Sequence, residues 1–265
     1  MNYLPKTKQC ILELNNNWLT IWFNRPEKRN ALSKELIIDI KLTLDAVKND
    51  HSIRGIIFRG KGGFFSAGAD LAEIKKIANA GADSRRLALE MSEKVGDLFD
   101  AISKTPQITI SVVEGAAMAG AFGIVCATDL LISMSDAKYA LTETRIGLTP
   151  AQIAPYVINR LGVSQARKLM LLGFIFDGKK GFEMGMVDYV ANDKIELDTQ
   201  ITKIKQKVLN CSPNAISVTK SILYSNNNID IKKAADLFSD CMVHDEGREG
   251  FSSFFEKRKP FWTKD

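Results

Sequence analysis

The sequence is poor in the residues that most often carry histidine or metal chemistry. Among 265 residues it has only two histidines, His51 and His244, and neither stands in a motif with a partner residue. Its four cysteines are widely spaced, and none forms a CxxC pair that would indicate a zinc site or a redox dithiol. Neither a phosphate-binding loop nor a dinucleotide fingerprint occurs. We therefore expect no metal, no cofactor and no histidine-based catalysis.

The sequence also lacks long apolar runs and dense blocks of one charge. The longest run of small and apolar residues, from Gly115 to Ala127, is too short to span a bilayer. The net charge is +5, and the densest basic stretch is only Glu256-Lys257-Arg258-Lys259. This modest positive charge suits a small polyanionic ligand and also nucleic acid. The absence of a dense basic stripe speaks against nucleic acid, and we expect no membrane partner. The unpaired cysteines, and a start without a leader pattern, indicate a cytoplasmic protein.

The apolar pattern alternates between strands and helices early in the chain and is mainly helical later. Residues 10–14 and 18–23 predict a hairpin around three asparagines, and Ser33 is a good N-cap for a helix over residues 34–47. This order predicts an α/β core over residues 1–197 and a helical segment over residues 198–265. Further strands are expected at residues 55–59, 108–113, 130–133, 138–141 and 187–190, and further helices at 71–78, 85–103, 198–209, 214–224, 231–243 and 247–257.

Two glycine-centred turns each follow an expected strand and precede an expected helix. The first is Phe64-Phe65-Ser66-Ala67-Gly68-Ala69-Asp70-Leu71, and the second begins at Gly115 and includes Gly120 and Gly123. Each turn leaves unpaired backbone N–H groups at a helix start. Two such groups that converge on one point would bind a developing oxyanion, helped by both helix dipoles. Tight packing would explain either turn alone, whereas the two together favour a functional site.

Five motifs, in order and spacing, resemble the crotonase family of enoyl-CoA hydratases and isomerases. They are residues 24–32, 65–71, 115–129, 143–150 and 254–258, and the resemblance covers nearly the whole chain. It implies a crotonase-like spiral of ββα units with a helical C-terminal segment that builds a homotrimer or a dimer of trimers. It also implies an acyl-CoA thioester as the ligand, so that CoA belongs to the substrate.

The resemblance further implies roles for individual residues. The N–H groups of Ala69 and Gly120 are the expected oxyanion pair, and Glu143 is the expected acid and base. Simpler roles remain open for some of the charged residues. Surface charges in contact with water would explain Lys28, Arg29 and Lys257, and a helix cap would explain Asp70. The residues expected at CoA are Lys28, Arg29, Ala67, Ala69, Asp70, Leu71, Phe254 and Lys257. In the family the last two often come from a neighbouring subunit. The residues expected at the acyl pocket, or otherwise in the core, are Met118, Phe122 and Gly123.

The chain departs from the family pattern in its acid–base groups. Hydratases of the family commonly use two glutamates, and the place of one of them is Gly123 here, while Glu143 occupies the other. Three interpretations remain open. Glu143 alone handles both proton transfers of a hydration, Glu143 is the single base of a double-bond isomerase, or the protein is a non-catalytic acyl-CoA- or RNA-binding protein.

The sequence around these positions favours hydration. Retention of Glu143 and of both turns speaks against a loss of chemistry. Residues 122–126 and 141–157 are similar to hydratases of β-branched glutaconyl-type thioesters, such as methylglutaconyl-CoA and isohexenylglutaconyl-CoA. We therefore expect an enoyl-CoA hydratase in which Gly123 makes room for a β-substituent. Arg145 is a candidate partner for a distal carboxylate, or else a surface ion.

Overall fold

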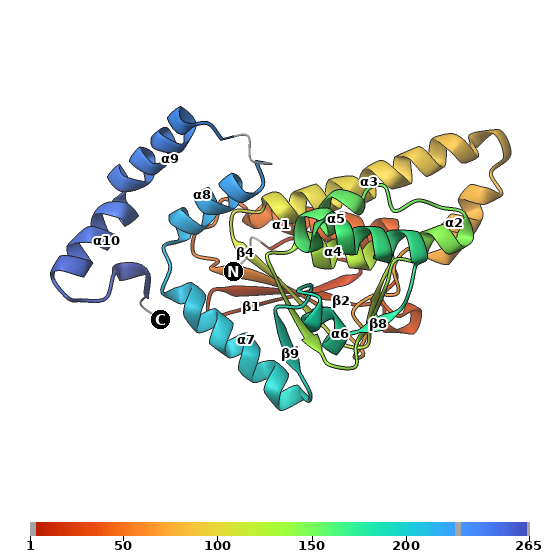
Figure 1. The fold of residues 1–265 in the computed structure, drawn as a ribbon, viewed down its shortest axis with the longest axis horizontal. Helices are drawn as coiled ribbons and strands as arrows, with labels where there is room; N and C mark the ends of the chain where they lie inside the picture. The colour runs from red at the N-terminus through yellow and green to blue at the C-terminus, as the bar shows by residue number, and fades with distance from the viewer. Residues whose placement is uncertain (1–3, 226–228, 264–265) are drawn as a thin grey trace.

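The computed structural model describes residues 4–225 and 229–263, and its centre is a six-stranded sheet (Figure 1). The first two strands form the expected hairpin, which turns at Asn16 and Asn17 with φ of 48° and 64°, a conformation that asparagine tolerates well. All other neighbouring strands are parallel. In sheet order the strands are β1 (Cys10–Asn15), β2 (Trp18–Phe23), β3 (Gly55–Gly60), β4 (Ile108–Val113), β6 (Leu130–Met134) and β9 (Tyr189–Ala191).

Alternate side chains of each strand bury opposite faces of this sheet. Leu19 and Ile21 of β2 enter the larger apolar core, whereas Trp18 enters a second cluster with the buried face of α7. The expected boundary between residues 197 and 198 falls inside α7. The helices of the larger core are α1 (Lys34–Val47), α3 (Ser84–Lys104), α4 (Gly120–Ala127) and α5 (Ala154–Leu172), and α7 is Lys194–Leu209.

A second, smaller sheet turns the chain into a spiral. Its strands are β5 (Ala116–Met118), β7 (Lys138–Ala140) and β8 (Phe176–Asp177). A strand of the large sheet is thus followed by a short extended piece and then a helix, as in β4–β5–α4. In the earlier turns of the spiral the short piece is a single bridging residue, Leu32 before α1 and Ser66 before α2 (Leu71–Ala78). The predicted spiral of ββα units is confirmed.

The last helices project from the core at one end of the molecule (Figure 1). Arg54, just before β3, holds the chain on both sides of these helices. Its guanidinium donates to the carbonyls of Val208, Cys211 and Trp262 at 3.1, 2.7 and 2.6 Å. We call α9 and α10 together the C-terminal arm. The remaining elements are α6 (Gly178–Glu183), α8 (Pro213–Leu223), α9 (Ile231–Val243), α10 (Asp245–Phe255) and the 3-10 helices η1 (Pro26–Lys28), η2 (Gly81–Asp83), η3 (Glu143–Ile146) and η4 (Phe261–Thr263).

No helix within residues 4–225 and 229–263 combines the length and apolar character needed to cross a membrane. Over the same residues, His, Cys, Asp and Glu side chains form no group of three or more that could hold a metal ion. Residues 1–3, part of the start without a leader pattern, lie outside the described residues.

Candidate active site

The first turn presents the backbone N–H of Ala69. The same peptide unit carries the Gly68 carbonyl, which accepts a 2.7 Å hydrogen bond from Leu32 N. Since this peptide is trans, the Ala69 N–H points away from Leu32. On the other side, Asp70 N donates to Leu32 O at 3.3 Å. Both flanks of Ala69 are therefore fixed, and no described residue accepts a hydrogen bond from its own N–H.

The second turn presents the N–H of Gly120, the first residue of α4. The Ala119 carbonyl of the same peptide accepts from Phe122 N at 2.8 Å and from Gly123 N at 3.3 Å. The Gly120 N–H therefore points out of the helix, toward its N-terminal side. Ala119 has φ 48° and ψ −119°, a strained conformation that costs about 1–3 kcal/mol and is typical of functional sites.

The two turns touch each other. An ideal Cβ on Gly68 (φ 87°) would lie 2.5 Å from the Met118 carbonyl oxygen, so a glycine is needed where the two chains meet. Leu32, which fixes Ala69, also reaches the second turn, since its Cδ1 lies 3.2 Å from the ideal Cβ position of Gly120. The geometry thus brings the expected oxyanion pair together, each N–H at a helix start.

Glu143 follows β7 much as Gly120 follows β5. These strands pair in parallel with Met118 opposite Ala140, and Ala119 N donates to Ala140 O at 2.9 Å. The paired strand ends therefore carry Gly120 and Glu143 to the same edge of the small sheet. Glu143 Oε2 is buried and has no hydrogen-bond partner among the described residues. Burial raises the pKa of this carboxyl above its ordinary value, against a weaker opposing effect of a backbone hydrogen bond.

An aromatic ring closes the space beside Gly123. An ideal Cβ there would lie 2.3 Å from Phe99 Cζ. Phe99, on α3, is fully buried and packs edge-on against Tyr156 with ring centroids 5.6 Å apart. The expectation that Gly123 makes room for a β-substituent is therefore wrong, because Phe99 occupies that room. The local sequence carries no signal for this contact, since Phe99 belongs to a different helix.

The other two expected acyl-pocket residues differ in burial. Phe122 is fully buried, and its ring meets those of Tyr139 and Phe176 at 6.2 and 6.1 Å. This burial agrees with the alternative interpretation of Phe122 as a core residue, and its assignment to the acyl pocket stays a prediction. Met118 is half-buried at the end of β5, directly before the strained Ala119, and stays a candidate for the pocket.

The basic and apolar residues expected at CoA lie beside the first turn. Lys28 and Arg29 are exposed, and Arg29 O accepts a 2.9 Å hydrogen bond from Ala67 N. Leu71, the first residue of α2, is 76% exposed. The structure therefore brings two cations and an open apolar side chain next to Ala69, a combination suited to phosphates and an adenine ring.

Asp70 is the N-cap of α2, one of the two roles expected for it. Its Oδ1 accepts from Ala72 N at 3.0 Å and caps α2, and its Oδ2 accepts from Arg25 Nη2 at 2.9 Å. Burial by itself would raise the pKa of Asp70, but the hydrogen bonds from Arg25 and Ala72 lower it below its ordinary value. Both carboxylate oxygens are engaged, which confirms the cap, while the assignment of Asp70 to CoA contact stays a prediction.

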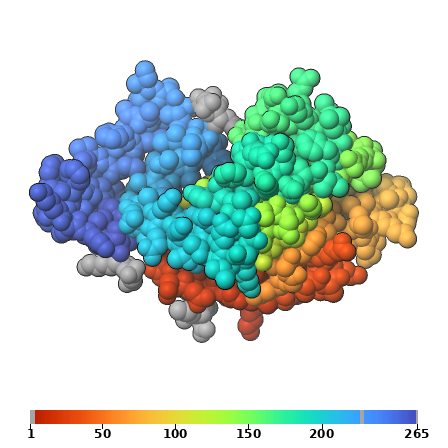
Figure 2. Space-filling view, turned by 60° about the horizontal axis from the view of Figure 1, so that its bottom comes forward, coloured from red at the N-terminus to blue at the C-terminus, as the bar shows by residue number. Residues whose placement is uncertain are grey.

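Phe254 and Lys257 lie far from the two turns. In Figure 1 α10 and α2 are at opposite ends of the long axis, and Figure 2 keeps the blue C-terminal helices and the orange residues of α2 apart in the same way. Phe254 is 77% exposed and lines a shallow apolar groove with Gly247, Gly250 and Phe251. A single chain therefore does not bring Phe254 and Lys257 to the expected CoA site.

Arg145 is exposed on η3, and its side chain lies along the end of α5. Its Nε is 3.2 Å from the ideal Cβ position of Gly173, the left-handed residue that ends this helix. A cation at a helix C-terminus is favourable. This placement supports the reading of Arg145 as a surface ion.

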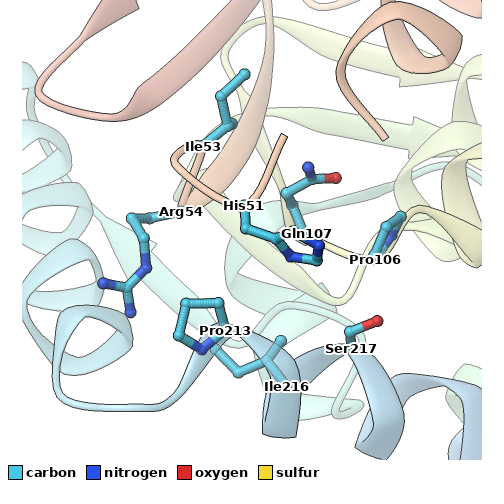
Figure 3. Close-up of a pocket in the computed structure, with 8 residues that line it drawn as sticks. All are labelled: His51, Ile53, Arg54, Pro106, Gln107, Pro213, Ile216 and Ser217. Atoms are coloured by element: carbon cyan, nitrogen blue, oxygen red, sulfur yellow. The ribbon is translucent and has the colours of Figure 1, made fainter. Parts of the chain in front are cut away.

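A small pocket lies at the other edge of the large sheet (Figure 3). Arg54 and Gln107, which line this pocket, directly precede β3 and β4. Glu143 and both turns instead follow strands, so the pocket lies at the opposite strand ends from the candidate site. The volume of about 10 Å³ is the room that one water needs. Arg54 Nε and Gln107 Oε1 are buried without a partner among the described residues, but a pocket of this size has no room for a thioester substrate.

Comparison with known proteins shows which family this chain matches. A family model described as enoyl-CoA hydratase/isomerase matches residues 13–265. A crotonyl-CoA hydratase of Syntrophomonas wolfei is 30% identical over 95% of this chain and 96% of its own length. The human mitochondrial methylglutaconyl-CoA hydratase is 28% identical over 94% of this chain and 74% of its own length.

Solved structures agree with the sequence comparison. The Pseudomonas aeruginosa protein AtuE superposes with a TM-score of 0.92 at 34% identity, covering 97% of this chain and 100% of that one. An enoyl-CoA hydratase/isomerase from Marinobacter aquaeolei gives a TM-score of 0.91 at 33% identity, covering 97% of this chain and 99% of that one.

Proposed function

The chain belongs to the enoyl-CoA hydratase/isomerase family, and we propose that it adds water to an α,β-unsaturated acyl-CoA with Glu143 as both acid and base. The observation that carries this proposal is the Glu143 carboxylate. Its Oε2 is buried and unpartnered among the described residues, at the edge where the Gly120 N–H emerges. Burial raises the pKa of this carboxyl, which makes its ionised form a stronger base for taking up and returning a proton.

In the proposed reaction the thioester carbonyl oxygen accepts hydrogen bonds from Ala69 N and Gly120 N. Glu143 removes a proton from water, the resulting hydroxide forms a bond to the β-carbon, and the electron pair of the double bond moves to the carbonyl oxygen. The two N–H groups stabilise this enolate. The proton held by Glu143 then goes to the α-carbon, so one water is added and the carboxylate is regenerated.

Phe99 supports a mechanism with a single carboxylate. It fills the side of Gly123 on which a second glutamate of the family would project. An apolar ring in that place also keeps bulk water from one side of the acyl group, which strengthens the electrostatic interactions at Glu143.

We further propose a β-branched, glutaconyl-type acyl group. This finer assignment is supported by the similarity of residues 141–157 to hydratases for such thioesters and by the human methylglutaconyl-CoA relative. The size of Gly123 gives it no support, because Phe99 takes that space.

We also propose a homotrimer or a dimer of trimers in which the C-terminal arm of one chain supplies Phe254 and Lys257 to the CoA site of another. The exposed groove on α10 supports this assembly, because such an apolar surface needs a cover. The cytoplasm is the proposed compartment, and the four free thiols, two of them buried, suit a reducing environment.

A panel of purified acyl-CoAs with mass readout tests the reaction. Straight-chain and β-branched 2-enoyl-CoAs are each incubated with the enzyme, beside a 3-enoyl-CoA. Hydration appears as the gain of one water. A double-bond shift without a mass change, and no water gain on any 2-enoyl-CoA, would replace the hydratase proposal by the isomerase alternative.

A further inference from the structure

One buried guanidinium joins the two chain segments that flank the Ala69 N–H. Arg25 Nη1 donates to Ala31 O at 2.6 Å, and Arg25 Nη2 donates to Asp70 Oδ2 at 2.9 Å. The side chains of Arg25 and Asp70 are only 14% and 13% exposed. A planar fork with two donors can hold two groups at once in a fixed relation, which a lysine ammonium does less well.

The two segments that Arg25 joins are the ones that orient Ala69. Leu32 follows Ala31 and binds the chain on both sides of Ala69, through Gly68 O and Asp70 N. The guanidinium joins the two segments next to these hydrogen bonds. Ala31, which it binds, directly precedes Leu32, and Asp70, which it also binds, directly follows Ala69. Without the guanidinium, backbone hydrogen bonds would still join the segments, those of Leu32 and that from Ala67 N to Arg29 O at 2.9 Å. The one directly after Ala69, from Asp70 N to Leu32 O, is already long at 3.3 Å.

The position of Arg25 is itself fixed by a buried asparagine. Arg25 N donates to Asn30 Oδ1 at 2.8 Å, and Asn30 N donates to Arg25 O at 2.9 Å. Asn30 Nδ2 in turn donates to Lys61 O and Phe64 O at 2.9 and 2.6 Å, which anchors the loop to the end of β3. Asn30 is fully buried with φ 53°. The backbone of Arg25 is therefore held in place, which restricts where its guanidinium can lie.

We infer that Arg25 is a positioning residue for the reaction: through Ala31 and Asp70 it sets the direction of the Ala69 N–H toward the thioester oxygen. This role rests on the proposed function, because it concerns the proposed oxyanion pair. In this role Arg25 acts through Ala31 and Asp70 and contacts neither the substrate nor Glu143. Its loss should therefore weaken stabilisation of the enolate more than it weakens binding of the thioester.

The test compares Arg25→Met, Arg25→Lys and Asp70→Asn by steady-state kinetics. We expect kcat to fall by roughly 10- to 100-fold in Arg25→Met, less than the ~10²–10³-fold of a lost oxyanion donor. KM should change by less than about threefold, since ground-state binding is kept. Asp70→Asn keeps a cap oxygen for α2 but removes the charged partner of Arg25. We expect it to lower kcat by a smaller factor, again with little change in KM.

A spectroscopic readout separates positioning from folding. A CoA thioester with an extended conjugated acyl group absorbs at longer wavelength when its carbonyl is polarised, and it is bound here in a Glu143→Gln background so that it is not turned over. Arg25→Met should lose most of the wavelength shift seen with the parent. Arg25→Lys, which keeps the charge without the fork, should recover only part of it.

Arg160 provides a matched control. It is also a buried arginine paired with an aspartate, Asp188, at 2.5 Å, and it donates to the carbonyls of Thr128 and Met186 at 3.1 and 2.8 Å. These contacts lie beyond the C-terminal end of α4, away from Ala69. Arg160→Met should lower the thermal midpoint without a change in the wavelength shift.

The outcomes are distinguishable. No wavelength shift with the parent would overturn the oxyanion pair, and with it both the proposed function and the role of Arg25. A normal shift in the parent that Arg25→Met retains, or a loss in Arg160→Met as large as that in Arg25→Met, would overturn the positioning role alone.

Discussion

The two ends of this molecule differ in what a single chain completes. Near α2 the turns at Ala69 and Gly120 and the carboxylate of Glu143 are assembled from one chain, with their backbone directions fixed by hydrogen bonds. At the other end the C-terminal arm leaves Phe238 69% and Phe254 77% exposed. The comparison is consistent with the proposed division, in which the spiral core carries the chemistry and the arm serves CoA binding and assembly.

The sharpest way to test this division is Glu143→Gln. Because Glu143 is the only carboxylate at a family acid–base position, we expect kcat to fall by ~10²–10⁴-fold. Affinity for a CoA thioester should change little, since the CoA contacts lie elsewhere. Steady-state kinetics measure the first quantity and calorimetric titration the second. A variant that keeps more than about a tenth of the wild-type kcat would show that another group carries the proton transfers.

The arm is tested by the oligomeric state. Light scattering should give three or six times the chain mass of 29.4 kDa. Replacing Phe238 and Phe254 together by Asp should yield a folded monomer, because both side chains are already exposed in the single chain. Its thermal midpoint should fall only by the stabilisation that assembly adds. CoA affinity should fall with the assembly.

Leu42→Asp, at an exposed position on α1 of the core, is the matched control and should leave the assembly intact. A wild-type monomer at micromolar concentration would refute both the assembly and the shared CoA site.

Gly123→Glu asks whether the core can regain a second carboxylate. The new side chain would collide with the buried Phe99 ring, and overpacking of this kind costs about 1–3 kcal/mol. We expect a lower free energy of unfolding in urea and no gain on straight-chain substrates. Stability equal to wild type together with faster hydration of crotonyl-CoA would mean that Phe99 leaves this site readily.

The smallest expected effect is on the pH dependence of stability. Burial raises the pKa of Glu143 in the folded chain above the unfolded value near 4.5, so the folded state binds this proton more tightly. The ionised group is therefore unfavourable at neutral pH, and the cost is lost as pH falls through the raised pKa. Glu143→Gln should melt above wild type at pH 7, and the difference should shrink toward pH 4.5. An unchanged or opposite difference would argue against burial as the cause.

Local signals were enough for most elements. Ser33 predicts α1, and its Oγ accepts from Leu36 N at 3.2 Å at the start of Lys34–Val47. The turn residues Asn16 and Asn17 likewise place the first hairpin. The start of α7 was expected four residues too late, although Asp193 is a readable cap whose side chain accepts from Glu196 N at 2.8 Å.

The parts that local signals missed depend on distant contacts. Ala116-Ala117-Met118 has no strand pattern and is extended because Ser66 and β7 pair with it. The ring of Phe99 over Gly123 and the ion pair of Arg25 with Asp70 likewise join different units of the spiral. Family motifs predict the candidate site, but contacts such as that of Phe99 with Gly123 can be seen only in the packed structure.

The contact of Gly68 with Met118 has a consequence for how such an enzyme can change its specificity. Since an ideal Cβ at 68 would lie 2.5 Å from a backbone oxygen of the other turn, any side chain at 68 would push the two turns apart. The spacing of the two N–H groups therefore depends on a glycine at this position. With these groups as the proposed thioester contacts, a change of acyl specificity has to leave Gly68 in place and act on other residues, such as Met118.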